Sequence, residues 1–180
     1  MKIMFISDIH GMACTLKKAL AHADNLSVDR IVILGDILYH GPRNGVPDLY
    51  DPNEVVRLLN ERKDQLLAVR GNCDAEVDQM LLKFPIMAEY SELLYGETRF
   101  FLTHGHIWNI DRLPDLPAGA ILAHGHTHIA RKILLENGIT IFNPGSISLP
   151  KNTLIRSFGI FEDGSLTIRD LETGNHIGFY

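Results

Sequence analysis

The sequence predicts an α/β fold with two sheets, and three observations support this. The first half of the 180-residue chain alternates apolar runs with amphipathic helical patterns, which is typical of a parallel sheet with covering helices. After Ala88 the helical period is lost and short strand patterns follow, so we expect a second sheet there. Hydrophobic residues make up 46% and charged residues 22% of the chain, as in one globular domain spanning residues 1–180.

The first strands and helix follow from simple apolar patterns. Ile3-Met4-Phe5-Ile6 is a short apolar run that indicates a buried strand. Residues 12–24 repeat apolar side chains every three or four positions, which predicts an amphipathic helix. Residues 30–34 form a second run that is apolar on both faces, so we expect a central parallel strand covered by helices.

A long loop and two further helices are predicted next. Residues 37–50 are rich in Gly and Pro and form a loop of a length that is usually functional. Asp51 and Glu54 predict a capping box for a helix over residues 52–63, and residues 65–69 predict a third strand. Asp74 is expected to cap another helix, whose apolar face would contain Val77, Met80, Leu81 and Phe84.

The second half is predicted to be mostly β. Turn signals such as Glu136-Asn137-Gly138 separate the strand patterns. The predicted strands are Leu93–Tyr95, Arg99–Thr103, Ala120–Ala123, Arg131–Leu135, Thr140–Phe142, Ser157–Phe161, Ser165–Asp170 and His176–Phe179.

Polar residues follow one predicted strand after another, and together they indicate a metal site. Ligands of open α/β sheets bind at the carboxyl ends of the strands, so these side chains are expected to meet. They number too many for one four-coordinate ion but suit two adjacent divalent ions that share a carboxylate. The mixed N and O donors favour Mn²⁺, Fe²⁺ or Zn²⁺ over Ca²⁺. The candidate ligands are Asp8, His10, Asp36, Asn72, His104, His126 and His128.

Composition excludes several other classes of function. The formal net charge is −5 and no cluster of cations is present, which argues against an extended nucleic-acid footprint. No apolar run is long enough for a signal peptide or a membrane span, so no membrane partner is expected. Cys14 and Cys73 cannot form a disulfide framework, and a cytoplasmic protein with free thiols is expected.

The ordered motifs resemble those of the calcineurin-like metallophosphoesterases. These motifs are Asp8-Ile9-His10, Gly35-Asp36, Gly71-Asn72, His104-Gly105 and Gly125-His126-Thr127-His128. With Gly41-Pro42-Arg43-Asn44 and Asn143-Pro144-Gly145-Ser146, the chain resembles the small YfcE-type phosphodiesterases, whose fold the retromer subunit shares. The resemblance covers nearly the whole chain. It implies a four-layer α/β/β/α sandwich, in which helices flank two packed mixed sheets.

The resemblance also implies how two metal ions are held and used. One ion would be bound by Asp8, His10, Asp36 and His128, and the other by Asp36, Asn72, His104 and His126, with Asp36 bridging. Two divalent ions and two carboxylates leave a charge of about +2, which favours a phosphoryl group. A hydroxide held between the ions would attack phosphorus directly. The expected cofactors are two divalent ions per chain, with Mn²⁺ favoured and Zn²⁺, Fe²⁺ or Ni²⁺ as alternatives.

Three further residues are candidates for catalysis. Many calcineurin-like enzymes have a proton-donating histidine after the motif asparagine, where this chain has Cys73. Either Cys73 is a small filler, or the leaving group receives its proton from Cys73, from His106 or from water. Arg43 either grips a substrate phosphate, with help from Asn44, or only orders its loop.

The remaining candidates are assigned more modest roles. His106 and His124 either ligate a metal or, as we favour, hydrogen-bond behind the ligands, and His40 is left open. His22 and His176 are expected to be structural or solvated, and Asn143 to Ser146 to form a structural turn. Packing in the core or at the rim is expected for Tyr39, Tyr50, Phe84 and Trp108.

The sequence therefore favours a metal-dependent phosphodiesterase acting on a small substrate. Two alternatives remain, a phosphomonoesterase and a scaffold protein that keeps the metal site as part of a binding surface. The complete ligand set favours an enzyme, because buried polar clusters are costly without a use. Apolar residues of the second half serve either a core or the interface of a homo-oligomer.

Overall fold

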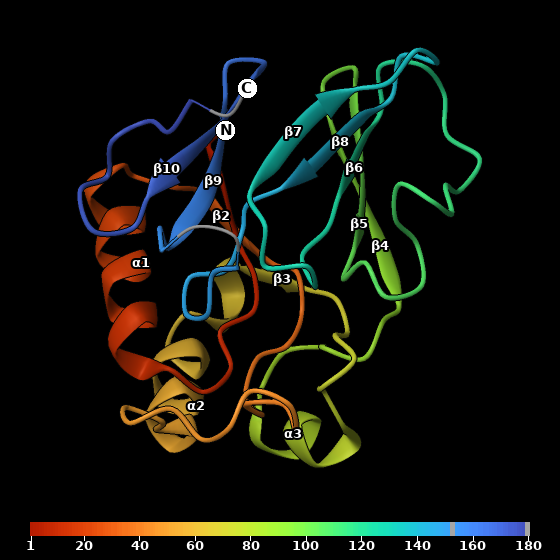
Figure 1. The fold of residues 1–180 in the computed structure, drawn as a ribbon. Coiled ribbons are helices and arrows are strands. Elements are labelled where there is room, and N and C mark those ends of the chain that lie inside the picture. Colours follow the sequence, from red (N-terminus) through yellow and green to blue (C-terminus); the bar gives the residue numbers. More distant parts are fainter. Residues whose placement is uncertain (152–153, 179–180) are drawn as a thin grey trace.

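Two five-stranded sheets lie face to face in the computed structural model, which describes residues 1–151 and 154–178 (Figure 1). The first sheet has the strand order β10-β9-β1-β2-β3 and the second has the order β4-β5-β6-β8-β7. Both are mixed, because parallel and antiparallel pairs occur in each. The predicted α/β class with two packed mixed sheets is confirmed.

The first sheet is built from both ends of the chain. Its parallel core is formed by β1 (Ile3–Ile6), β2 (Arg30–Ile33) and β3 (Leu66–Ala68). On the other side of β1, β9 (Ser157–Glu162) pairs antiparallel, and β10 (Ser165–Asp170) completes the edge. The expectation that the whole second half adds a second sheet is therefore wrong for β9 and β10. Their alternating patterns are the same in either sheet, so only tertiary packing decides their place.

The second sheet contains the remaining strands. It consists of β4 (Tyr90–Tyr95), β5 (Thr98–Thr103), β6 (Ile121–Ala123), β7 (Arg131–Leu134) and β8 (Thr140–Asn143). β5, β6 and β8 run parallel, while β4 and β7 pair antiparallel at the edges. Seven of the eight predicted strands of this half are present within a few residues. The eighth is reduced to a single bridge between Arg169 and His176, and Phe179 lies outside the described residues.

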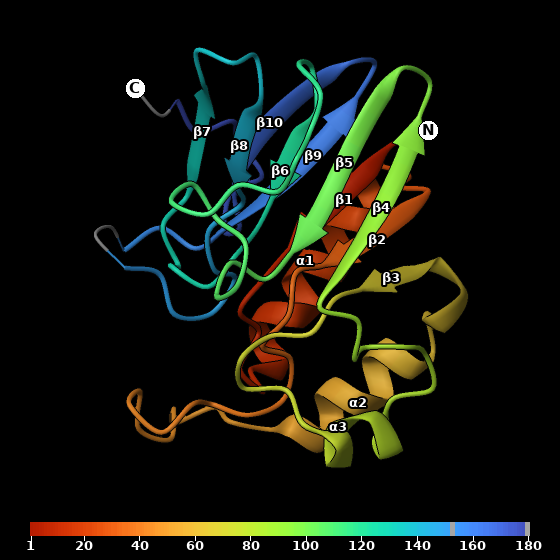
Figure 2. The ribbon, with the colours of Figure 1, turned by 90° about the vertical axis from the view of Figure 1, so that its right-hand side faces the viewer.

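The helices gather on one side of the molecule. α1 (Ala13–Asn25) covers the outer face of the first sheet, and α2 (Pro52–Asn60) and α3 (Glu76–Leu81) lie near its lower end in Figures 1 and 2. A 3₁₀ turn, Lys63–Gln65, follows α2. No helix is described between β5 and β6, where residues 104–120 cover the second sheet as irregular chain. The fourth layer is therefore a loop segment, where the family resemblance implied helices.

The two faces of the central strand β1 belong to different cores. Ile3 and Phe5 point into the core between the sheets, with Phe100 and Phe142 of the second sheet. Met4 and Ile6 point into the core beneath the helices, and all four residues are fully buried. Burial on both faces explains the continuous apolar run and makes β1 a rigid base for the residues that follow it.

Three local predictions about helices need correction. Asp51 caps α2 by accepting a hydrogen bond from the Glu54 amide at 3.1 Å, but the Glu54 carboxylate pairs with Lys17 and Arg57, so no capping box forms. In α3, Ala75 stands at the N-cap in place of Asp74. The predicted apolar face is wrong too, because Val77, Met80 and Leu81 are exposed while Phe84 is buried. None of the described helices is long and apolar enough to cross a membrane.

Candidate metal centre

The ends of five strands, three from one sheet and two from the other, bring polar side chains to one place. Asp8 and His10 follow β1, Asp36 follows β2 and Asn72 follows β3. From the second sheet, His104 follows β5, and His126 and His128 follow β6. The backbone links these exits, since the amides of Asp8 and His10 donate to the carbonyls of Gly35 and Asp36. The seven predicted ligands therefore come from the same edge of the two packed sheets.

The backbone at these positions is unusual. Among the described residues, seven that are not glycine have a left-handed φ, and five of them are Asp8, His10, Asp36, His126 and His128. Such a conformation costs roughly 1–2 kcal/mol for a residue with a side chain, and it concentrates at functional sites. Here the turn it produces directs the side chain away from the strand and toward the common centre. This backbone feature is an independent sign that the edge is a site.

Three of the ligand candidates form a group that we call the inner half-site, defined as Asp8, His10 and His128. Their side chains are almost fully buried. The Nε2 atoms of His10 and His128 lie 3.3 Å apart, and the Nε2 of His128 lies 3.4 Å from Oδ1 of Asp8. The three groups offer one ligand atom each within 4.8 Å of one another. This spacing suits a single cation bound between them.

A second group, the outer half-site, is defined as Asn72, His104 and His126. The Nε2 of His104 lies 3.0 Å from Oδ1 of Asn72, and the two rings of His104 and His126 have centroids 5.1 Å apart. His104 is buried, but Asn72 is exposed and His126 is half-buried. Asp36 lies between the half-sites, with Oδ2 3.7 Å from Nε2 of His10 and Oδ1 3.4 Å from Nε2 of His104.

Three imidazoles are held so that the same nitrogen faces the centre. The Nδ1–H groups of His10, His104 and His128 donate to the backbone carbonyls of Tyr39, Leu34 and Leu149 respectively. A carbonyl can only accept, so these bonds place the proton on Nδ1 and leave Nε2 available as a ligand. A hydrogen bond from the distal nitrogen is the usual way in which a metal-binding histidine is oriented.

Two features of the inner half-site fit a cation. Where neither Nε2 carries a proton, the lone pairs of His10 and His128 face each other at 3.3 Å, which is repulsive without a positive charge between them. In addition, Oδ1 of Asp8 is a buried carboxylate oxygen with no hydrogen-bond partner among the described residues. An orphaned buried acceptor is costly, and a metal ion would satisfy it. The donor set therefore fits divalent metal ions.

The pKa values of Asp36 and His104, at the middle of the site, are shifted in opposite directions. Burial is the largest single influence on both Asp36 and His104 and disfavours their charged forms, but their hydrogen bond and attraction to each other, together with the contributions of other neighbours, outweigh it. The pKa of Asp36 is consequently lowered well below its usual range, and that of His104 is raised to about 9, so a metal ion that binds Nε2 of His104 would have to displace a proton from it. Burial lowers the pKa of His128, and that of His126 falls to about 4, so these imidazoles are neutral and able to ligate.

Asp74 supports the site in a way that the sequence did not reveal. Its carboxylate accepts hydrogen bonds from the amides of Asp36, Ile37 and Gly71, at 2.9, 2.8 and 2.7 Å. It therefore ties the exit of β2 to the exit of β3 and fixes the backbone of Asp36, the candidate bridging ligand. Burial raises the pKa of Asp74, although the amides of Ile37 and Gly71 oppose the change. An aspartate before a helix has the same local pattern as an N-cap, so sequence alone indicated the wrong role.

The turn from Asn143 to Ser146 is structural, as predicted, and supports the inner half-site. The Asn143 amide donates to the Gly125 carbonyl and to Thr127 Oγ1. Ser146 Oγ donates to the Asp8 carbonyl at 2.9 Å and accepts from the Leu149 amide at 2.8 Å. The carbonyl of Leu149 in turn holds His128, so the turn connects two inner ligands.

Cys73 and Arg43 both line a cavity of about 740 Å³ that opens onto the centre. Burial, followed by the charge of Asp36, raises the pKa of the Cys73 thiol to about 12, so it stays protonated at neutral pH. Its sulfur can approach His10 and Asp36 to within ligand spacing. Arg43 is exposed at the rim, while Asn44 donates to the His40 carbonyl and orders the loop.

His106 is exposed and is not among the residues that line this cavity. Its ring centroid lies 5.4 Å from that of His104, and burial, followed by the charge of His104, lowers its pKa. His124 is buried and lies 3.0 Å from the Gly125 carbonyl, so it packs behind the ligands.

The other aromatic and histidine side chains take packing roles, with one exception. His22 donates to the Leu171 carbonyl and stacks on Phe158, and His40 contacts Tyr39 and Tyr50 within its loop. Phe84 is in the core and Trp108 packs on Phe101 and Arg112. Tyr39 is the exception because it is 40% exposed and lines the cavity. Arg70 and Lys151 also line it and were not singled out from the sequence.

Comparisons with known proteins agree with this geometry. Residues 1–164 match the model of the calcineurin-like phosphoesterase superfamily domain. The chain is 44% identical over 169 residues to "Phosphodiesterase YfcE" of Escherichia coli K12, covering 93% of this chain and 91% of the relative.

Solved structures extend the comparison. A structure of E. coli Yfce, described as a phosphoesterase, aligns with a TM-score of 0.96 and 43% identity over 99% of this chain and 97% of that one. Vps29 of Cryptosporidium parvum aligns with a TM-score of 0.62 and 20% identity over 98% and 94% of the two chains, which is a likeness of fold.

Proposed function

The chain belongs to the calcineurin-like phosphoesterase superfamily, and we propose that it is a metal-dependent phosphodiesterase that hydrolyses a small phosphodiester. The observation that carries the proposal is the convergence of Asp8, Asp36 and three oriented Nε2 atoms on one buried centre beside an open cavity. The choice of a diester rests on the relative named a phosphodiesterase, which is 44% identical to this chain.

We propose that the inner half-site and Asp36 hold one divalent ion, and that the outer half-site and Asp36 hold a second. When bound, such a pair of ions activates water as a nucleophile near neutral pH and neutralises charge on the phosphoryl oxygens. The protein's part is to keep Nε2 of His10, His104 and His128 directed inward through their Nδ1 hydrogen bonds. Asp36 is suited to bridging because its pKa is low and its two oxygens face different half-sites.

We propose that Arg43, which lines the cavity beside this centre, attracts the phosphoryl group of the substrate. Cys73 stays protonated, but a thiol with a pKa near 12 is a weak proton donor. The chain therefore suits substrates whose leaving group departs without much protonation, with His106 or water supplying the proton otherwise. We propose Mn²⁺ as the metal in the cell, because the ligand candidates offer a mixture of N and O donors. We propose the cytoplasm as the compartment of the protein, since both cysteines are free thiols.

The proposal is tested with two substrates that share one leaving group. The Mn²⁺-loaded protein is assayed on bis(4-nitrophenyl) phosphate and on 4-nitrophenyl phosphate. We expect faster release of nitrophenol from the diester, its loss after EDTA treatment and its recovery when Mn²⁺ is restored. Faster hydrolysis of the monoester would favour a phosphomonoesterase, and no metal-dependent hydrolysis of either would favour a scaffold.

A further inference from the structure

We propose that the cavity contains a second anion subsite formed by Arg43, Arg70 and Lys151, and that the substrate is a phosphodiester carrying an additional phosphate group. The inference rests on the proposed phosphodiesterase function and names the class of its substrate. It is argued from the placement of the three cations, from their lack of acidic partners and from the charge of the site.

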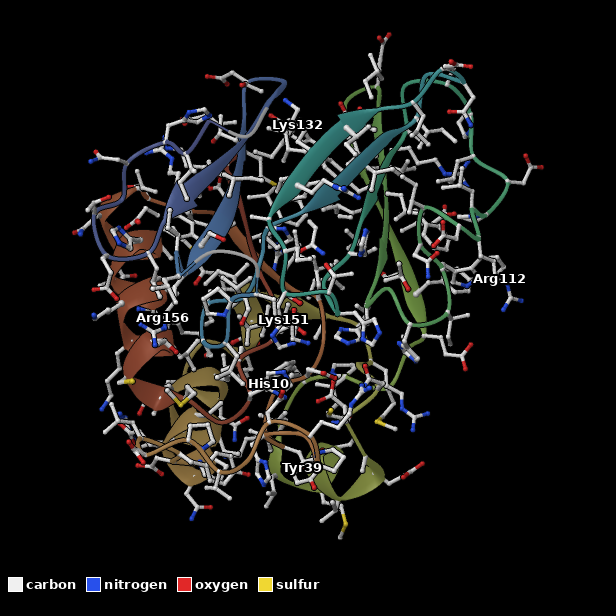
Figure 3. All side chains as sticks on the ribbon, viewed as in Figure 1. His10, Tyr39, Arg112, Lys132, Lys151 and Arg156 are labelled. Carbon is white, nitrogen blue, oxygen red and sulfur yellow. The ribbon has the colours of Figure 1, made fainter. Side chains whose placement is uncertain are left out.

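The three cations come from separate segments and share one cavity only in the folded chain. Arg43 lies in the loop of residues 37–50, Arg70 follows β3, and Lys151 follows the segment that holds His128. All three line the cavity of about 740 Å³ together with the metal-ligand candidates. Figure 3 labels Lys151 and Tyr39 on either side of His10, at the edge where the strands end.

These cations are not neutralised by neighbouring acids. Within the described part of the chain, no carboxylate lies within 4.0 Å of any of the three. The two acids that line the cavity are occupied elsewhere, since Asp74 accepts from three amides and Asp36 faces His10, His104 and the Cys73 amide. By contrast, six other basic side chains pair with acids, namely Lys2, Lys17, Lys18, Arg57, Arg62 and Arg99.

The charge of the site exceeds what a simple diester needs. Two divalent ions with the carboxylates of Asp8 and Asp36 would leave about +2, which a hydroxide between the ions and the scissile diester, at about −1 each, would balance. Three further cations therefore add positive charge that the diester alone does not balance, in a chain whose formal net charge is −5. A second phosphate would contribute about −1.5 to −2 and accept charge-assisted hydrogen bonds. The cavity is also of a size that takes a whole small ligand.

The alternative is that the cations act only on the scissile phosphoryl group. A matched pair of substrates separates the two cases: thymidine 5′-(4-nitrophenyl phosphate) and the same compound with a 3′-phosphate. They share the scissile bond and the leaving group, and they differ only in the additional phosphate. The quantity measured is the ratio of kcat/KM for the phosphorylated substrate to that for the plain one.

We expect the wild-type ratio to be about tenfold or more, the size of one or two charge-assisted hydrogen bonds. Lys151→Gln, at an exposed side chain, should lower the ratio about fivefold, and Arg70→Gln should change it in the same direction. Lys63→Gln, in the exposed 3₁₀ turn and away from the cavity lining, should leave the ratio unchanged. The ratio should also fall as salt is raised from about 0.01 M to about 0.5 M.

A binding measurement without catalysis completes the test. Calorimetric titration of the metal-free protein should show tighter binding of thymidine 3′,5′-bisphosphate than of thymidine 5′-monophosphate, and Lys151→Gln should reduce the difference. A wild-type ratio near one, or equal losses on both substrates in the variants, would overturn the subsite while leaving the phosphodiesterase intact. If the metal-loaded protein hydrolysed neither substrate, the proposed function would fail and the subsite with it.

Discussion

The inner and outer half-sites differ in how firmly their donors are held. Asp8, His10 and His128 are buried, and both imidazoles are fixed by backbone carbonyls. In the outer half-site, His104 is the one ligand candidate with such support among the described residues, while Asn72 is exposed and His126 is half-buried beside the cavity. Donors that are already fixed lose little freedom when a ligand binds, so the inner half-site should bind its ion more tightly. We therefore expect the outer half-site to exchange its ion more readily than the inner one.

Replacing the residue between the half-sites should have the largest effect. Asp36→Asn removes a charge that both ions would share, so we expect diesterase activity to fall by more than about 100-fold and bound metal to fall below two ions per chain. Asp115→Asn, at an exposed side chain outside the cavity lining, is the control. Unchanged activity in folded Asp36→Asn protein would contradict a bridging role.

Alanine substitutions on opposite sides should separate the two half-sites. We expect His126→Ala to retain about one tightly bound Mn²⁺ after gel filtration, because the inner donors are intact. His128→Ala should retain less than one Mn²⁺ per chain, because the inner half-site then has only His10 and the buried carboxylate of Asp8 to bind an ion. Metal content per chain is the readout for both. Equal metal content in the two variants would show that the half-sites do not differ.

A substitution at Gly71, which precedes Asn72 of the outer half-site, should reduce activity by displacing Asp36. A Cβ placed on Gly71 would lie 2.1 Å from Oδ1 of Asp36, so Gly71→Ala must displace the bridging carboxylate. We expect a loss of stability of about 1–3 kcal/mol by denaturant unfolding, together with reduced activity. Gly96→Ala, where a Cβ would meet nothing within 4 Å, should keep full activity and lose only what its left-handed φ of 57° costs, about 1–2 kcal/mol.

The smallest effect on activity is expected from a substitution in the turn that supports the inner half-site. Ser146→Ala removes a buried hydroxyl that bonds the Asp8 carbonyl and the Leu149 amide. We expect a loss of stability of about 1–3 kcal/mol and weaker binding of the inner ion, while the outer ion is unaffected. Ser165→Ala, on an exposed position of β10, serves as the control. Metal titration followed by thermal unfolding measures both effects.

The positions where strands end could be predicted from the sequence, because an apolar run followed by polar residues is a local pattern. Apolar runs such as Ile3 to Ile6 are buried on both faces, and the polar residues after them stand out by contrast. The partners of β9 and β10 could not be predicted, since alternation specifies a half-buried strand but not its sheet. The role of Asp74 was missed because two of its three amide donors, those of Asp36 and Ile37, come from a turn 38 and 37 residues away in the sequence. Similarly, a role for Arg70 and Lys151 could not be predicted, because only the folded chain shows that both line the cavity.

The account is tested most directly by locating the metal ions in crystals grown with Mn²⁺. Anomalous difference maps should show two peaks, about 3.5–4 Å apart, on either side of Asp36. One peak should lie within bonding distance of Asp8, His10 and His128, and the other within bonding distance of Asn72, His104 and His126. A single peak, or peaks that leave Asp36 without contact to either ion, would contradict the account.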